Sequence, residues 1–495
     1  MRRTLQRSCA SCARAKHSCD LGTPRCSRCV KRGVQCAYAN EPLSAPIPNA
    51  ETQHGIRGSG ALMTRCPFPP VDPFESYPQT RLARDHVQRL IHSFLNKIAF
   101  QYYPLDLSAA SNPFLVSWWP LALGDPALFH VSLQTACLDE ELLAQRGFAA
   151  SEMLMADSVV LLRRKVEDAA LAVQDGTMNS VITLATIEFG KGNIAVAMMH
   201  LDGVVKLVNL RGGINSVRQT SPLTARMVSW VSLLITGHPQ FETQDDEGVG
   251  DGIPPIAGWE IDSSAAAEGM GMAELDEVAV DPGVANVFVR LRHVLKRAGR
   301  APSRFPTTRL HDLTCFVVHR LLRLSPSRAR GDASPPSPSP SPSPISECLR
   351  YAMVLFMLII QGPTYYSHAV LQDVIVARLR DQLEMAASEY RVYGPIDVWI
   401  LAVAMVSSAG TAPYAQFAAR GCEVAASLEL RNGIDAIEVV KGVLWLPTVS
   451  CEGIFQSHWD AVLGGEAQEP SIVRASCSAA GDLSMVCRDQ DREWV

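Results

Sequence analysis

The chain has 495 residues, of which 47% are hydrophobic, so it is long enough for a small module together with a large packed core. Its net charge of −5 hides an asymmetry: residues 1–40 hold nine lysines and arginines and one acid, a charge of +8, whereas the remainder carries −13. A basic head on an acidic body predicts a polyanionic partner for the head alone.

The sequence indicates neither secretion nor a membrane. The first ten residues are polar and basic and lack the apolar region of a signal peptide. The longest apolar run, Tyr351–Ile360, is too short to cross a bilayer. We therefore expect a reducing compartment, where clustered cysteines bind metal. The alternative is a disulfide-bonded knot in a secreted protein.

Six of the 14 cysteines lie between residues 9 and 36 at the spacing C-x2-C-x6-C-x6-C-x2-C-x6-C, in which the second half repeats the first. They are Cys9, Cys12, Cys19, Cys26, Cys29 and Cys36. Thiolates suit tetrahedral zinc, and each zinc needs four ligands. If two sulfurs each bridge both metals, these cysteines satisfy two zinc ions. The segment has almost no apolar core, so we expect zinc binding to supply its folding energy.

This spacing resembles the fungal zinc binuclear cluster, a DNA-binding module of transcription factors, and Pro24, Lys31-Arg32-Gly33 and Tyr38 also match it. The resemblance implies a nuclear, sequence-specific regulator of RNA polymerase II genes that binds double-stranded DNA. Lys16 matches the family lysine that donates to guanine O6 and N7 in CGG-like half-sites. The Cys-Ala-Ser-Cys-Ala start resembles the subset that includes the aflatoxin-pathway regulator, which implies a secondary-metabolism pathway.

The remaining DNA contacts are expected from basic side chains around the cysteines. Arg14 and His17 flank Lys16, but Ala13, Ala15 and Ser18 stand where the family often has basic residues. Fewer charges here mean weaker phosphate anchoring from this segment. The residues expected to carry more of the anchoring are Arg7, Arg25, Arg28, Lys31 and Arg32. The alternative for Lys16 is a solvated surface lysine.

The expected domain order is a basic arm (1–8), the zinc cluster domain (9–38), a linker (39–80), a helical regulatory domain (81–463) and a disordered polar tail (464–495). The linker is rich in proline and has no heptad pattern before residue 80. Many relatives place a dimerising coiled coil there. A homodimer of this chain would therefore form through the helical body, or the protein binds DNA as a monomer.

The fold class expected is mostly α: the small two-zinc module followed by a large all-α domain. Apolar residues recur at helical spacing from residue 81, as in Val87, Leu90, Ile91 and Phe94, and period-2 runs are scarce. Helices are predicted at roughly 81–98, 125–144, 155–173, 178–189, 193–210, 221–236, 283–299, 307–323, 346–361, 366–390, 395–407 and 434–446.

A second resemblance lies in the body. One stretch of the regulatory domain of fungal zinc-cluster factors is similar to His200-Leu-Asp-Gly203 followed by Leu210-Arg-Gly-Gly213. The C-terminal tryptophan pair of that domain is similar to Trp445 and Trp459. Ser232 replaces the aspartate of that family's W-x-D, which begins here at Trp230. Glycines 212 and 213 are expected to end a helix. His200 is interpreted as a hydrogen-bonded core histidine rather than a ligand sensor.

Two compositionally biased stretches interrupt the body. Residues 240–282 hold twelve acids and no lysine or arginine, with Trp259 and methionines interspersed. We interpret them either as a solvated insertion or as a disordered activation segment that binds transcription coregulators. Residues 325–345 form a Ser-Pro tract that cannot pack a core and is expected to be an extended linker.

Three classes of function compete. A DNA-binding regulator accounts for the cysteine spacing and the basic head. A zinc-targeted enzyme is the second, but the sequence contains no P-loop, G-x-S-x-G, H-E-x-x-H or dinucleotide-binding loop, so we expect no enzymatic activity. A zinc-dependent protein-interaction module on a helical scaffold is the third, and the basic head argues against it.

Overall fold

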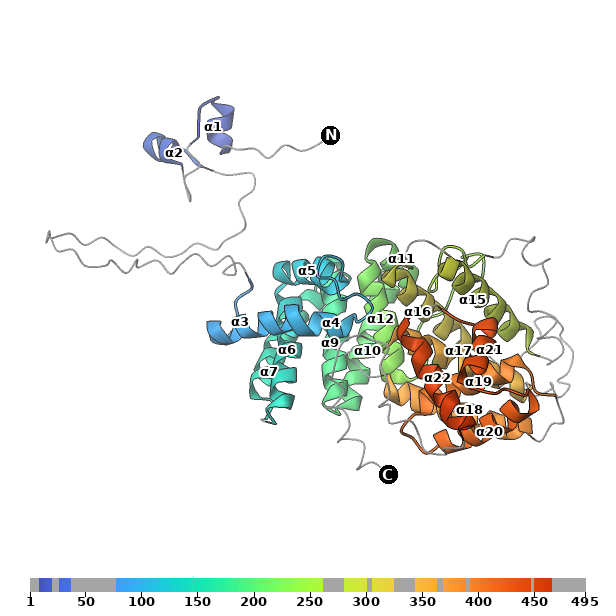
Figure 1. Cartoon of the computed structure of the whole chain (residues 1–495). Helices are drawn as coiled ribbons and strands as arrows, with labels where there is room; N and C mark the ends of the chain where they lie inside the picture. The colour runs from blue at the N-terminus through green and yellow to red at the C-terminus, as the bar shows by residue number, and fades with distance from the viewer. Residues whose placement is uncertain are drawn as a thin grey trace, which may run out of the picture. The chain divides into compact units, whose positions relative to one another are not determined.

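The computed structural model describes residues 9–19, 26–36, 77–145, 147–260, 280–300, 305–324, 343–362, 368–387, 392–446 and 449–464. The chain divides into two compact units, Met1–Asp72 and Pro73–Val495 (Figure 1). Unit 1 contains the helices α1 (Ala10–Arg14) and α2 (Ser27–Arg32). The basic arm, the linker up to residue 76, the Ser-Pro tract up to residue 342 and the tail from residue 465 lie outside the described residues.

The first half of unit 2 is a succession of helices interrupted by two short π-helical turns. These elements are α3 (Arg84–Ser93), η1 (Phe94–Ile98), α4 (Ala99–Tyr102), η2 (Phe114–Trp118), α5 (Trp119–Gly124), α6 (Pro126–Leu143), α7 (Ala149–Val166), α8 (Ala169–Ala172), α9 (Asp175–Gly190), α10 (Ile194–Leu210), α11 (Ile214–Thr220) and α12 (Pro222–Thr236). Helices α6 and α9 are buried along most of their length and pack against each other. Both are buried on nearly every face, as helices inside a large core are, and α9 buries Thr177, Asn179 and Thr183 along with its apolar side chains.

The second half contains α15 (Pro282–Arg300), α16 (Thr307–Arg323), α17 (Pro344–Gln361), α18 (Ala369–Ala387), α19 (Pro395–Ser408), α20 (Tyr414–Ser427), α21 (Gly433–Val443) and α22 (Val449–Leu463). Helix α17 packs against α15, α16, α18 and α19, and α12 against α16, which joins the two halves. Of the described helices, α17 alone is long and apolar enough to cross a membrane, but 83% of that stretch is buried inside the protein.

The prediction of a mostly α protein is confirmed. Every regular secondary-structure element in the described ranges is a helix. The β pairing found there is one isolated bridge between Thr243 and Ile253. Predicted stop signals act as expected: Gly212 and Gly213 have φ of +96° and +91° just after α10. Proline at the first position begins α6, α12 and α19 because its missing N–H has no helical acceptor there.

Two predicted boundaries were wrong. The helix expected over 155–173 is two helices, because the Asp168 side chain accepts hydrogen bonds from the amides of Ala170 and Leu171 and starts α8 anew. The Ser-Pro linker was expected to reach residue 345, yet Pro344 already begins α17 and Ile345 is buried. The tract therefore ends in a helix start rather than in extended chain.

The acidic stretch differs from both interpretations over its first half. Phe241, Ile253, Ile256 and Trp259 are buried in the core of unit 2, so residues 240–260 are a packed loop rather than a solvated or disordered one. Residues 261–279 lie outside the described residues. The apolar side chains hold residues 240–260 against the core, and two of the acids there have basic partners: Asp246 lies near Arg290 and Arg320, and Glu242 pairs with Arg323.

The other predicted motifs of the body lie on α10, on α12, in the segment after α21 and on α22. His200 is only half-buried, so the interpretation as a core histidine was wrong; burial lowers its pKa. Trp230 and Ser232 are buried on α12. Trp459 is buried on α22, and the Trp445 ring lies 5.2 Å from that of Phe455.

Candidate metal centre and nucleic-acid interface

The two helices of unit 1 begin in the same way. Cys9 is the N-cap of α1 and its Sγ accepts a hydrogen bond from the amide of Cys12, at 3.4 Å. Cys26 is the N-cap of α2 and accepts from the amide of Cys29, also at 3.4 Å. The repeated C-x2-C pattern thus gives two equivalent helix starts, each with a sulfur in place of the usual capping oxygen.

The six sulfurs form two groups of four. One group is Cys9, Cys12, Cys19 and Cys26, and the other is Cys9, Cys26, Cys29 and Cys36; within each, the sulfurs lie within 4.8 Å of one another. Cys9 and Cys26 belong to both groups. The sequence predicted that two sulfurs must be shared without saying which two, although each of these residues opens one repeat.

The sulfur spacing fits zinc and excludes disulfides among these pairs. Cys9 Sγ lies 3.8 Å from Cys26 Sγ and 3.6 Å from Cys29 Sγ, and Cys12 Sγ lies 3.7 Å from Cys26 Sγ. A tetrahedron with Zn–S bonds of about 2.3 Å has edges of about 3.8 Å, whereas a disulfide bond is about 2.05 Å long. The donor set therefore fits two tetrahedral ions that share two sulfurs.

The protonation preferences of the thiols differ between shared and unshared positions. The backbone N–H of Cys12 lowers the pKa of Cys9 to about 6, and that of Cys29 lowers the pKa of Cys26. Burial raises the pKa of Cys12 to about 12 and also raises that of Cys29. Without cations, the buried sulfurs would repel one another as thiolates, so metal charge is needed to ionise the full set.

The basic side chains of unit 1 surround this cluster on its surface. Arg14 ends α1, and Lys16 and His17 follow it. Arg28, Lys31 and Arg32 lie on α2, and all six side chains are exposed. Arg7 and Arg25 lie outside the described residues. The Ser11 hydroxyl donates to the carbonyl of Gln35, at 2.5 Å, and so ties the two halves together. The sequence pattern contained no signal for this link.

Lys16 has a left-handed backbone, with φ of 52°. Gly33 occupies the equivalent position of the second repeat, with φ of 60°. In both repeats the next amide turns back to the carbonyl of the second cysteine, from His17 to Cys12 at 2.9 Å and from Val34 to Cys29 at 3.2 Å. This turn ends the helix and leaves the lysine side chain exposed immediately beyond it.

Comparison with known families matches both units. Residues 7–45 match the fungal Zn(2)-Cys(6) binuclear cluster domain, and residues 89–271 match the fungal specific transcription factor domain. No curated protein and no solved structure matches the chain. The first domain binds two zinc ions, as the two sulfur groups of unit 1 would require. Both matched families are domains of fungal transcription factors.

Proposed function

We propose that this protein is a nuclear, sequence-specific DNA-binding regulator of RNA polymerase II genes, in which Cys9 and Cys26 bridge two zinc ions and Cys12, Cys19, Cys29 and Cys36 complete the ligand sets. The observation that carries the proposal is the pair of four-sulfur groups sharing two residues, beside six exposed basic side chains. Zinc would hold α1 and α2 in a fixed relation and so position Lys16 against a base edge.

The expected target is a CGG-like half-site. A lysine can donate to O6 and N7 of guanine, and its exposed position after α1 favours such a contact. Arg14, His17, Arg28, Lys31 and Arg32 would contact phosphates, with Arg7 added from the arm. The start of the cysteine pattern suggests a fungal secondary-metabolism pathway as the regulated process.

The test of the metal assignment is elemental analysis combined with binding to a CGG-containing duplex. The full chain should hold two zinc ions. Removing them with a chelator should abolish DNA binding, and adding zinc back should restore it. Cys422→Ser is the control, because this exposed cysteine lies in α20 of unit 2. One metal or none in a protein with all six thiols reduced would contradict the proposal.

DNA binding and the competing protein-interaction function differ in their salt dependence. Neutralising phosphates releases counterions, so affinity for DNA should fall steeply between low and physiological salt. A contact with a protein partner through the same head need not. If the zinc-loaded protein shows no salt-sensitive binding to DNA, the protein-interaction function is favoured instead.

Coregulators are expected to bind the acidic part of the body that follows the packed loop. Deleting residues 240–282 would also remove buried Phe241 and Trp259, so it cannot separate folding from activation. Deleting only residues 261–279 leaves the packed loop in place. If these residues contribute to activation, reporter output should fall while DNA occupancy and protein abundance stay constant. Unchanged output would mean that they are an insertion without this role.

A further inference from the structure

Helix α15 contains no acidic residue, although the chain beyond residue 40 carries a net charge of −13. Arg290 of this helix lies 3.7 Å from Asp246, and Arg292 donates to the carbonyl of Gly442 at 2.7 Å. Arg297, near the C-terminal end of α15, is exposed. The helix therefore brings positive charge to the surface of a mainly acidic unit.

Arg297 meets a second arginine, Arg309 of α16, over the backbone of Gly258. A Cβ added to Gly258 would lie 3.5 Å from Arg297 Nη1 and 3.5 Å from Arg309 Nη2, so the two nitrogens are at most twice this distance apart. Gly258 has φ of +82° and no side chain, which leaves room for both guanidinium groups. The fold thus holds two like charges close together, and their repulsion favours an anion beside them.

The Arg309 guanidinium is held in place by unit 2. Its Nη2 donates to the carbonyl of Ala257, and its Cζ lies 5.1 Å from the centre of the Phe305 ring. Its Nε is buried and has no hydrogen-bond partner in the part of the chain that the structure describes. Buried N–H groups are nearly always paired in folded proteins, so Arg309 has donor capacity left for an acceptor.

The start of α16 adds to the positive potential. Arg309 is the third residue of this 17-residue helix, and the N-cap residue Pro306 makes no side-chain hydrogen bond to it. The first amides of a helix carry partial positive charge and have no acceptor within the helix. An oxyanion beside Arg309 is therefore favoured by the helix as well as by the two arginines.

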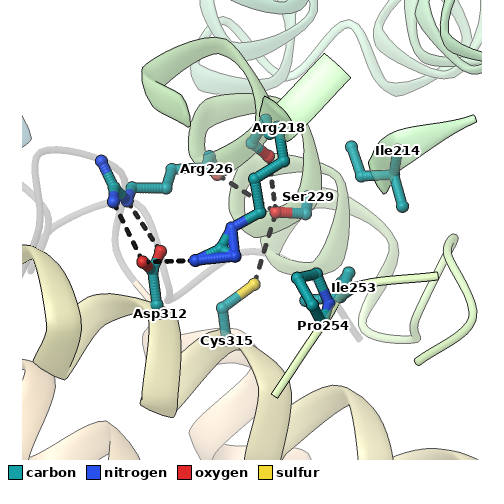
Figure 2. Close-up of a pocket in the computed structure, with 9 residues that line it drawn as sticks. Ile214, Arg218, Arg226, Ser229, Ile253, Pro254, Asp312 and Cys315 are labelled. Atoms are coloured by element: carbon teal, nitrogen blue, oxygen red, sulfur yellow. Dashed lines mark hydrogen bonds and ion pairs between the residues drawn. The ribbon is translucent and has the colours of Figure 1, made fainter. Parts of the chain in front are cut away.

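A second pair of arginines in unit 2 shows how such charges are otherwise compensated. Arg218 and Arg226 share the carboxylate of Asp312, with contacts of 2.9 Å from Arg218 and of 2.7 and 3.0 Å from Arg226 (Figure 2). Within the described ranges, by contrast, no ion pair joins a carboxylate to Arg297 or Arg309. The pair over Gly258 is therefore open to an anion from outside the described residues.

We propose that Arg297 and Arg309 form a binding site for a phosphate monoester. Such a group carries a charge of about −1.5 to −2 at pH 7, which matches two guanidinium groups, whereas one carboxylate would compensate only one of them. Guanidinium groups also donate in pairs to phosphate oxygens. The phosphate belongs either to a small molecule or to a phosphorylated side chain of a partner protein. The site lies in unit 2, so this inference goes beyond the zinc cluster and DNA recognition.

The test uses the purified, zinc-loaded full chain and two probes: O-phosphoserine and a short Ser-Pro peptide phosphorylated on its serine. Isothermal titration should show saturable one-to-one binding of at least one probe, and the unphosphorylated peptide should bind at least about tenfold more weakly. Tighter binding of the phosphopeptide than of phosphoserine assigns the site to a phosphorylated protein, and equal or weaker binding assigns it to a small phosphate ester. No saturable binding of either probe up to about 10 mM, or equal binding of the unphosphorylated peptide, would overturn the proposal.

Matched variants locate the bound phosphate. Arg297→Gln changes an exposed side chain, so probe binding should weaken about tenfold or more while the melting temperature stays the same. Arg309→Lys keeps the charge but loses the planar fork, and it should also weaken binding. Arg89→Gln, at an exposed arginine of α3, is the control and should change neither quantity. All three variants keep the basic side chains of unit 1, so unchanged binding in Arg297→Gln would place the phosphate elsewhere and overturn the proposal.

Discussion

Lys16 is exposed and has a left-handed backbone conformation, which residues other than glycine rarely adopt. Its φ is 52°. Gly33 takes the same conformation in the second repeat, where the absence of a Cβ removes the steric cost. A left-handed non-glycine residue costs on the order of 1 kcal/mol relative to glycine. Strain of this kind is retained where the side chain has a use, which supports the proposed guanine contact.

Replacing Lys16 by glycine and by alanine separates recognition from folding. Both variants lose the base contact, so both should lose roughly 1–3 kcal/mol of binding to a CGG site and relax the preference at that step. Lys16→Gly should in addition stabilise the zinc module by up to about 1 kcal/mol, because it removes the left-handed strain. Fluorescence anisotropy and thermal unfolding of the same preparations measure the two effects.

Gly33→Ala is the matched control, since no atom lies within 4 Å of the added Cβ and only the backbone conformation is disturbed. It should destabilise the module by about 1 kcal/mol and leave the base preference unchanged. If Lys16→Gly binds CGG and scrambled sites with the same ratio as the native protein, the lysine reads no base.

Lys31 and Arg32 are expected to contact DNA phosphates rather than a base. Both are exposed in the last turn of α2, where a phosphate contact would hold the module without reading sequence. Either change to alanine should weaken binding to specific and scrambled DNA equally and lower the salt slope by about one unit. Lys206→Ala, an exposed lysine of α10 in unit 2, serves as the control. A selective loss of the CGG site would reveal a base contact instead.

At the scale of elements, the packed acidic loop depends on Asp246. Its carboxylate accepts from Trp259 Nε1 at 3.0 Å and from Asn286 Nδ2 at 2.6 Å, and Arg290 and Arg320 lie 3.7 and 3.6 Å away. These bonds and charges lower its pKa, although burial opposes them. One side chain thereby joins the loop to α15 and α16.

Asp246→Asn should destabilise unit 2 by about 1–3 kcal/mol, because it leaves buried donors and two guanidinium groups without a charged partner. Because folding lowers this pKa, its stabilisation is present above the unfolded value of about 3.9 and is lost as the pH falls through the folded pKa. The difference between variant and native protein in urea unfolding should therefore be full at pH 7 and shrink below about pH 4. Asp381→Asn, at an exposed pair, should change little. A difference that stays constant with pH would contradict this role.

Helix positions could be predicted from the sequence where the apolar spacing was regular. They were predicted less well where a capping side chain determined where a helix begins. Helices such as α10 and α16 follow their predicted ranges closely. The prediction did not include η2 with α5, α11, α20 or α22. Helix α20 is rich in alanine and buries only one face, which weakens its periodic signal. The Asp168 cap divides a helix that apolar spacing alone joins.

At the scale of the whole molecule, the metal centre could be predicted and the contacts between distant helices could not. The six cysteines lie close in sequence, so their spacing nearly determines their chemistry. Trp230 and His311 belong to different helices of the body, and only the packing of α12 against α16 brings them together. A tryptophan and a histidine far apart in the sequence carry no pattern that predicts this ring contact.

The division into two units leads to the prediction on assembly. A fragment ending near residue 60 contains the zinc cluster domain and no heptad pattern, so nothing in its sequence supports a coiled-coil dimer. It should bind one half-site weakly as a monomer. The full chain should bind paired half-sites cooperatively only if unit 2 dimerises, and its apparent affinity should then depend on protein concentration.

Measuring both proteins against single and paired triplets, at two salt concentrations, separates these contributions. Salt should weaken every complex through the phosphate contacts, whereas the gain from pairing half-sites should persist in the full chain because it comes from protein–protein contact. Analytical ultracentrifugation of the same samples gives the oligomeric state directly. Cooperative dimeric binding by the short fragment would contradict the argument from the missing heptad. Equal affinity of the full chain for single and paired sites would instead show that it binds as a monomer.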